Sequence, residues 1–167
     1  MVPLVSSFML STKEGKKAWV EPVIDPLAPD GWRFEVKTGK LSKEQEALLK
    51  QGTIGRSTGG TCILTGTSMP FSYVREEGQS HGLGVRLMAV VAEGARGRIY
   101  LSPSDEHVAI ANEAKPAWEP EGELPNNPRD FKTPNYGMRT FASLFTPRQL
   151  VALTTFSDLV GEAREKV

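Results

Sequence analysis

The sequence predicts an α+β fold with a mainly antiparallel sheet, a long C-terminal amphipathic helix and one or two shorter helices. Short segments of β-branched and aromatic residues alternate with turns rich in Gly, Pro and Asp, as in antiparallel hairpins. The segment 85–92 is apolar almost throughout, which is typical of a strand covered on both faces. The strongest helix signals lie in the last third of the chain.

Five strands are expected, near residues 18–23, 32–37, 61–65, 85–92 and 98–101. The first two form a hairpin across a turn that contains Asp30 and Gly31, and Pro22 places the first strand toward an edge. We expect 85–92 at the centre of the sheet, next to 98–101, because a strand that is apolar on both faces needs a cover on each.

Three helices are expected, near residues 41–51, 104–114 and 147–165. Ser42 is a good N-cap for the first helix, and Gly52 follows its end. The third helix begins with a capping box, in which Thr146 is the N-cap, Pro147 takes the first helical position and Gln149 stands three residues after the cap.

The third helix carries an apolar stripe whose members recur at spacings of three and four. They are Leu150, Leu153, Phe156, Leu159, Val160 and Ala163. Such a stripe usually packs on the sheet of the same chain. The alternative is that part of it docks on protein outside these residues.

The length of 167 residues suits one domain with a real core. We expect an α+β domain over 1–115, a Pro-rich connector over 116–134, and a C-terminal helical segment over 135–167 that packs on the domain. The connector contains five prolines. A Pro-rich segment is stiff enough to lie along a surface.

Charge and hydropathy restrict the classes of function. Twenty basic residues balance twenty acidic ones, so the whole chain lacks the basic excess of most nucleic-acid-binding proteins, and DNA contact would need a local patch. No apolar run approaches the ~20 residues of a membrane-spanning helix, and the N-terminal segment has no signal-peptide pattern. We expect a cytoplasmic protein with no membrane partner.

A local basic patch is expected around the ends of the first hairpin. Its DNA-binding candidates are Lys13, Lys16, Lys17, Lys37 and Lys40, with Lys43 close by. A rim of lysines can be a solvated edge that prevents pairing between sheets of different molecules. The alternative is a surface that contacts phosphates.

A second DNA-binding candidate lies in the segment after the prolines. Asn135 and Tyr136 join an amide to an aromatic ring, and such a pair can hydrogen-bond to a base and stack on it. Arg129, Lys132 and Arg139 flank the pair. A turn with a packed tyrosine is the simpler interpretation.

The sequence assigns no catalytic residue. The patterns G-x-S-x-G, H-E-x-x-H and C-x-x-C are absent, and the Gly-rich segment 52–60 fits neither glycine motif for phosphate binding. Cys62, His81 and His107 are too few and too scattered for a thiol nucleophile with its base or for a tetrahedral zinc site. We expect no metal site and no cofactor in this chain.

Several segments resemble one known family, among them KKAWVEP, FEVKTG, VREEG, RLMAVVAEG and RIYL. The closing segment is the most specific, with NYGM, LFTPRQL and ALTTFSDLV. The chain resembles the central region of the large adenine-specific DNA methyltransferases of bacteria and archaea that carry a zinc-ribbon insert. The resemblance covers nearly all of the chain. It implies a restriction-modification role, with DNA, a catalytic methyltransferase domain and S-adenosylmethionine as partners of the full-length protein.

Three departures limit what the resemblance implies for this chain. Thr65 stands at the second cysteine position of the Cys-x-x-Cys-Gly knuckle that would begin with Thr61 and Cys62, and the partner Cys-Pro-x-Cys would lie upstream of Pro3. The zinc ribbon within 1–115 is therefore expected to be degenerate, without structural zinc. The family's cofactor-binding and Asp-Pro-Pro-Tyr motifs also lie outside this region.

The resemblance thus implies a non-catalytic insert or fragment that aids DNA binding or recognition. The alternative is a structural module that docks on a catalytic domain or on a partner subunit.

Overall fold

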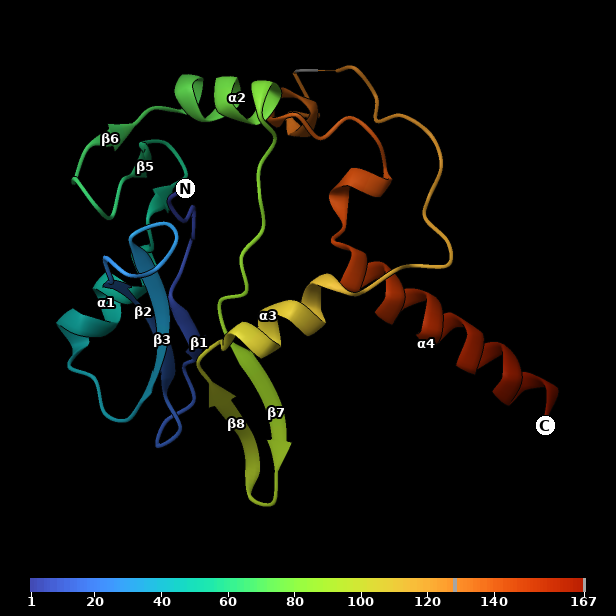
Figure 1. Ribbon diagram of the computed structural model, residues 1–167, viewed down its shortest axis with the longest axis horizontal. Coiled ribbons are helices and arrows are strands. Elements are labelled where there is room, and N and C mark those ends of the chain that lie inside the picture. The colour runs from blue at the N-terminus through green and yellow to red at the C-terminus, as the bar shows by residue number, and fades with distance from the viewer. Residues whose placement is uncertain (128, 167) are drawn as a thin grey trace. The chain divides into compact units, whose positions relative to one another are not determined.

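The computed structural model describes residues 1–127 and 129–166, and these residues form an α+β fold as predicted (Figure 1). The helices are α1 (Lys43–Gln51), α2 (Phe71–Ser80), α3 (Asp105–Asn112) and α4 (Pro147–Glu165). Two short 3-10 helices cover Thr133–Tyr136 and Ala142–Leu144. The strands are β1 (Met9–Ser11), β2 (Ala18–Ile24), β3 (Trp32–Thr38), β4 (Ile54–Gly55), β5 (Gly59–Thr61), β6 (Ser68–Met69), β7 (Val90–Gly94) and β8 (Gly97–Leu101).

The chain divides into two compact units. Unit 1 comprises Met1–Val74 and Arg86–Ser104, and unit 2 comprises Arg75–Val85 and Asp105–Val167. The division falls inside α2. It differs from the sequence-based boundaries near 115 and 135, because α3 and the Pro-rich segment group with α4.

Within the described residues the strands form three separate antiparallel sheets, so the expectation of a single sheet is wrong. Their strand orders are β1-β2-β3, β4-β5-β6 and β7-β8. β2 is the middle strand of the first sheet, not an edge. Its Pro22 is nevertheless tolerated because β1 pairs only with Ala18 and Trp19 and leaves the later part of β2 uncovered on that side.

The core of unit 1 lies on one face of the β1-β2-β3 sheet. Its buried side chains are Phe8, Val20, Trp32 and Phe34. Trp32 and Phe34 are two residues apart on β3, so they share a face, and their rings meet edge to face with centroids 4.8 Å apart. Met88 and Ala89 pack against this core from the segment before β7.

That packing explains why the strand expected over 85–92 is wrong. The strand begins only at Val90, and Met88 and Ala89 before it pack against the core without joining a ladder. β7 pairs only with β8, and Val91, Ile99 and Leu101 are exposed. An apolar run indicates burial, but it does not distinguish a central strand from an irregular segment.

The strand expected over 61–65 is also wrong after Thr61. The chain turns at Cys62, whose N–H donates to Thr67 O at 2.9 Å and whose carbonyl accepts from Gly66 N–H at 2.8 Å. Gly66 takes a φ of 71°, which favours glycine. The strands expected near 18–23, 32–37 and 98–101 are confirmed as β2, β3 and β8.

The helix starts are where the capping residues predict them. In α1 and α4 the cap and the residue three positions later exchange both hydrogen bonds, Ser42 with Gln45 and Thr146 with Gln149. α3 ends at Asn112, two residues before the expected end.

α2 was not among the helices expected from the sequence, and it contains Gly78. Its glycine is needed for packing, since a Cβ at Gly78 would lie 2.6 Å from Tyr136 O.

Unit 2 is organised by backbone contacts of an irregular segment. Leu124 N–H donates to Arg139 O at 2.7 Å, and Phe141 N–H donates to Gly122 O at 3.2 Å. In the same unit α3 contacts α4. Among the residues described, no helix is both long and apolar enough to cross a membrane.

Candidate functional site

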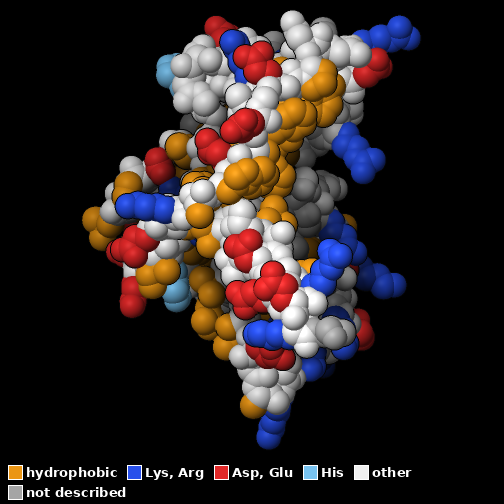
Figure 2. All heavy atoms as spheres, turned by 90° about the vertical axis from the view of Figure 1, so that its right-hand side faces the viewer, with side chains coloured by type: hydrophobic (Ala, Val, Ile, Leu, Met, Phe, Trp, Pro, Cys, Tyr) orange, Lys and Arg blue, Asp and Glu red, His pale blue; other side chains and the backbone are white. Residues whose placement is uncertain are grey.

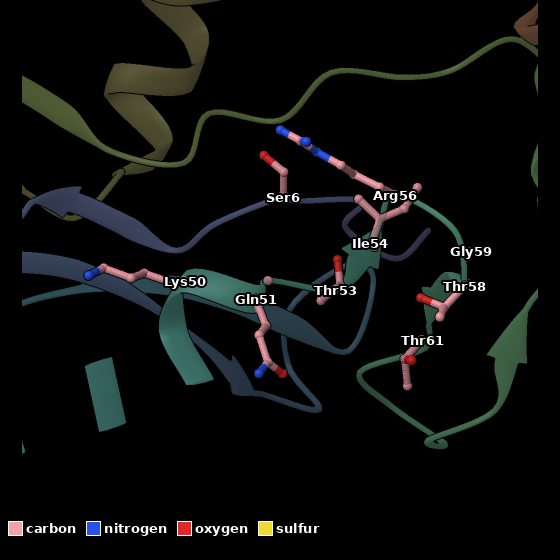
Figure 3. A pocket seen from close by; sticks show the side chains of 11 residues that line it. Ser6, Lys50, Gln51, Thr53, Ile54, Arg56, Thr58, Gly59 and Thr61 are labelled. Carbon is pink, nitrogen blue, oxygen red and sulfur yellow. The ribbon is translucent and has the colours of Figure 1, made fainter. Parts of the chain in front are cut away.

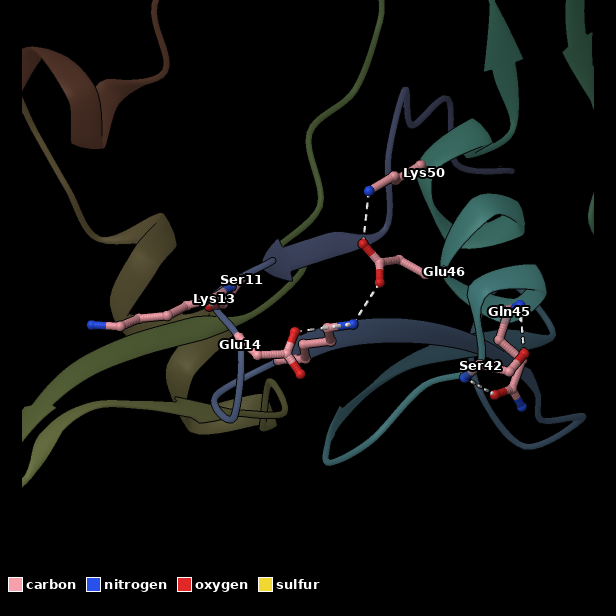
Figure 4. A network of polar contacts seen from close by, with 8 residues as sticks. Ser11, Lys13, Glu14, Ser42, Gln45, Glu46 and Lys50 are labelled. Atoms are coloured by element: carbon pink, nitrogen blue, oxygen red, sulfur yellow. Dashed lines mark hydrogen bonds and ion pairs between the residues drawn. The ribbon is translucent and has the colours of Figure 1, made fainter.

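Two of the five candidate lysines of unit 1 are held in ion pairs. Lys17 Nζ lies 2.6 Å from Glu46 Oε2, and Lys50 Nζ lies 2.7 Å from Glu46 Oε1, so one carboxylate bridges two ammonium groups (Figure 4). The hydrogen bonds from Lys17 and Lys50 lower the pKa of Glu46 to about 2. The hydrogen bond to Glu46 in turn raises the pKa of Lys17. Lys17 therefore ties the turn before β2 to α1 and is not part of a free surface.

Lys37 is the second of these. Its ammonium group lies 2.5 Å from Glu35 Oε2, and Arg33 pairs with the other oxygen of the same carboxylate. The hydrogen bond to Glu35 raises the pKa of Lys37, and the bond from Lys37 lowers the pKa of Glu35. Because Lys37 is neutralised by its neighbour on β3, it adds little to the field around the sheet.

Lys13, Lys16 and Lys40 form the part of the rim that remains open, here called the basic end of unit 1. All three are exposed, and among the described residues none is in an ion pair. Gly39 N–H donates to Lys17 O at 3.2 Å, so the end of β3 and the turn before β2 lie side by side. Lys16 Nζ donates to Arg96 O at 3.1 Å. Three of the expected residues are thus brought to one end of the β1-β2-β3 sheet.

The two units differ in charge. Unit 1 has twelve Lys and Arg residues against eight Asp and Glu, a net charge of +4, and unit 2 has eight against twelve, a net charge of −4. The balance of the whole chain therefore hides a basic half. This division favours unit 1 over unit 2 as a partner for a polyanion.

In unit 2, Asn135 and Tyr136 pack against α2. Asn135 O accepts a hydrogen bond from Gln79 Nε2 at 2.9 Å, and the Arg75 guanidinium lies 5.6 Å from the centre of the Tyr136 ring. Gly137 closes the turn with a φ of 87°. The pair therefore forms a packed turn, and Arg75 covers one face of the ring that a base would need.

The cations that flank this turn are exposed. Arg129, Lys132 and Arg139 form no ion pair with any residue the structure describes. They lie in the acidic unit, however, which weakens their attraction for DNA. Of the two expected patches, the basic end of unit 1 is the better candidate.

No group of three or more His, Cys, Asp and Glu side chains that could hold a metal ion occurs in the described part of the chain. Cys62 belongs to unit 1, whereas His81 and His107 belong to unit 2. The hydrogen bond with the Thr65 side chain lowers the pKa of the Cys62 thiol. Thr65 thus supports the turn through its hydroxyl, at the position where the resembled family has a second cysteine.

A cavity of about 660 Å³ lies between the segment before β1, the end of α1 and the β4–β5 turn (Figure 3). Its charged lining residues are Lys50 and Arg56, and no carboxylate lines it. The Arg56 side chain extends toward Ser6, whereas Lys50 points away toward its partner Glu46. The cavity also faces the C-terminal end of α1, whose carbonyl groups repel anions. Arg56 would attract an anion, whereas the C-terminal end of α1 would repel it. The cavity therefore has no defined preference for a class of ligand.

Sequence reasoning missed Arg96 and Arg75. Arg96 meets Lys16 across eighty residues of sequence, and Arg75 lies in the unexpected helix α2. No periodicity or motif marks either contact.

Comparison with protein-family models, with curated proteins and with solved structures finds no match to this chain.

Proposed function

We propose that this chain is the non-catalytic insert of an adenine-specific, S-adenosylmethionine-dependent DNA methyltransferase, and that it helps to hold DNA. The observation that carries the proposal is the basic end of unit 1. Three exposed lysines without ion pairs lie there, in a unit of net charge +4. Cations that are not already neutralised can replace the counterions of DNA phosphates. The resemblance of the closing segment to the methyltransferase family supplies the identity of the polyanion.

In this proposal the chemistry belongs to the catalytic domain. Among the described residues, no group of three or more His, Cys, Asp and Glu side chains could hold a metal ion, and the sequence assigns no catalytic residue. S-adenosylmethionine would be held by the catalytic domain, and this chain would contribute sequence-independent affinity through phosphate contacts.

A binding measurement tests the proposal. Fluorescence anisotropy of the purified chain with short duplex and single-stranded DNA, at low and near-physiological salt, should show binding that weakens steeply with salt. S-adenosylmethionine, tested alongside by calorimetry, should not bind. The triple variant Lys13→Gln, Lys16→Gln, Lys40→Gln should lower the log–log salt slope by about 2.7, at 0.9 for each lost contact.

A matched control is Arg129→Gln, Lys132→Gln, Arg139→Gln, which removes the same charge from unit 2 and should have the smaller effect. The control would be the more damaging variant if the turn in unit 2 were the contact. Absence of DNA binding by the unchanged chain would contradict the proposal.

A specific observation favours a second candidate, a protein-docking role for α4. Figure 2 shows hydrophobic side chains at the surface, and those of α4 that are more than half exposed are Leu153, Phe156, Leu159 and Val160. Only Leu150 of the predicted stripe is buried. A stripe of this kind is typical of a helix that docks on another protein surface, and the catalytic domain is the partner that the resemblance offers.

A further inference from the structure

Two turns of unit 1 that are distant in sequence lie beside each other. One turn precedes β2 and contains Lys13 and Lys16, and the other joins β7 to β8 and contains Arg96. Lys16 Nζ donates to Arg96 O at 3.1 Å, and it lies 3.4 Å from the position of a Cβ on Gly97. The tip of the β7–β8 hairpin is therefore part of the same end of unit 1 as the exposed lysines.

The hairpin is held in this place by contacts within unit 1. Val36 N–H donates to Ser102 Oγ at 2.8 Å, and β3 contacts β8. Gly94 pairs with Gly97 across a two-residue turn, and Gly97 has a φ of 114° that a side chain would strain. Arg96 is thus presented by a tight turn whose base is anchored on the sheet.

The β7–β8 hairpin adds two arginines, Arg96 and Arg98, to the lysines of this end. Arg96 and Arg98 are exposed, and neither forms an ion pair with any described residue. With the basic end they make five cations. The turn before β2 and the β7–β8 hairpin carry two carboxylates, Glu14, which lies 3.8 Å from Lys17, and Glu93, opposite Arg98 in the ladder. Five cations against two carboxylates leave a clear positive excess.

We propose that Arg96 and Arg98 extend the basic end into one continuous surface that binds the phosphate backbone of duplex DNA. A guanidinium group can donate two parallel N–H bonds to one phosphate, which a lysine cannot do. The cations are exposed, come from three chain segments and do not line the cavity beside α1, so they suit a repeating polyanion rather than a small ligand. This inference rests on the proposed function and adds two residues to it.

The test uses the full chain, a short fluorescent duplex and a salt series. Arg96→Gln with Arg98→Gln should weaken binding roughly three- to thirty-fold and lower the log–log salt slope by about 1.8. Arg96→Lys with Arg98→Lys keeps both charges and should restore most of the salt slope. Arg148→Gln with Arg164→Gln removes two charges from α4 in unit 2 and serves as the matched control, with little change expected. Circular dichroism of each variant checks that the fold is kept.

The outcomes separate this inference from the proposed function. If the Arg96 and Arg98 variant binds like the unchanged chain while the lysine triple variant loses affinity, the inference is overturned and the proposed function stands. If the α4 control loses as much affinity as the hairpin variant, the effect is one of net charge and the inference also fails. If the unchanged chain binds no DNA, both fail. Equal binding to poly-glutamate would assign the surface to an acidic protein and overturn the inference.

Discussion

The two units of this chain hold their helices and strands together in different ways. Unit 1 has a conventional core, in which Trp32 and Val20 are almost completely buried. In unit 2 the buried hydrophobic side chains described are Leu124 and Leu150, and backbone contacts join α2 to the segment around Gly137. α4 thus buries little of its apolar stripe, Leu150 alone among the predicted stripe residues, whereas the sheet of unit 1 depends on apolar burial.

Substitutions in the core of unit 1 should cost far more stability than substitutions on the exposed stripe of α4. Trp32→Ala removes a fully buried ring and should lower the free energy of unfolding by about 3–5 kcal/mol. Phe156→Ala removes a ring that is 73% exposed and should change the free energy by no more than about 0.5 kcal/mol. Urea denaturation measures both. Equal costs for the two variants would mean that the α4 stripe is covered in solution.

In unit 2, close backbone packing leaves no room for a side chain at Gly137. Gly137→Ala would place a Cβ 2.0 Å from Gly78 O at a φ of 87°, so it should destabilise the contact by about 1–3 kcal/mol. Hydrogen exchange of the amides in α2 and residues 135–141 should show the opening. Gly161→Ala is the matched control, because its Cβ meets nothing within 4 Å and should stabilise α4 by about 0.5–1 kcal/mol. Unchanged exchange in the first variant would argue against the close packing.

The smallest expected effect concerns the ion pairs of unit 1. The pKa of Glu46 in the folded chain is about 2, below its ordinary value of 4.5, so its contribution to stability is present above pH 4.5 and is lost as the pH falls toward 2. Glu46→Gln should therefore be less stable than the unchanged chain at neutral pH, and the difference should disappear in acid. Denaturant titrations at several pH values measure this. A difference that persists at low pH would assign the loss to packing rather than to charge.

Much of the candidate site could be predicted from sequence, because lysines near the ends of a hairpin must lie near each other once β2 and β3 pair. That reasoning fails for Lys17 and Lys37, since their carboxylate partners are chosen by packing. Glu46 reaches Lys17 from α1, a contact that spans 29 residues. Such partners decide which lysines stay without an ion pair. They therefore also decide how positive the electrostatic potential is at this end of unit 1.

The α+β class, the β2–β3 hairpin and the starts of α1 and α4 could all be predicted from the amino-acid sequence. These features depend on neighbours within a few residues, in alternation, turn residues and capping boxes. Long-range packing determines that the strands form three sheets, that Met88 and Ala89 pack on the core without pairing, and that Gly78 is a packing position in a helix. It also decided that Arg96 lies beside Lys16. Contacts of this kind join residues far apart in sequence, and the local hydrophobic periodicity does not predict them.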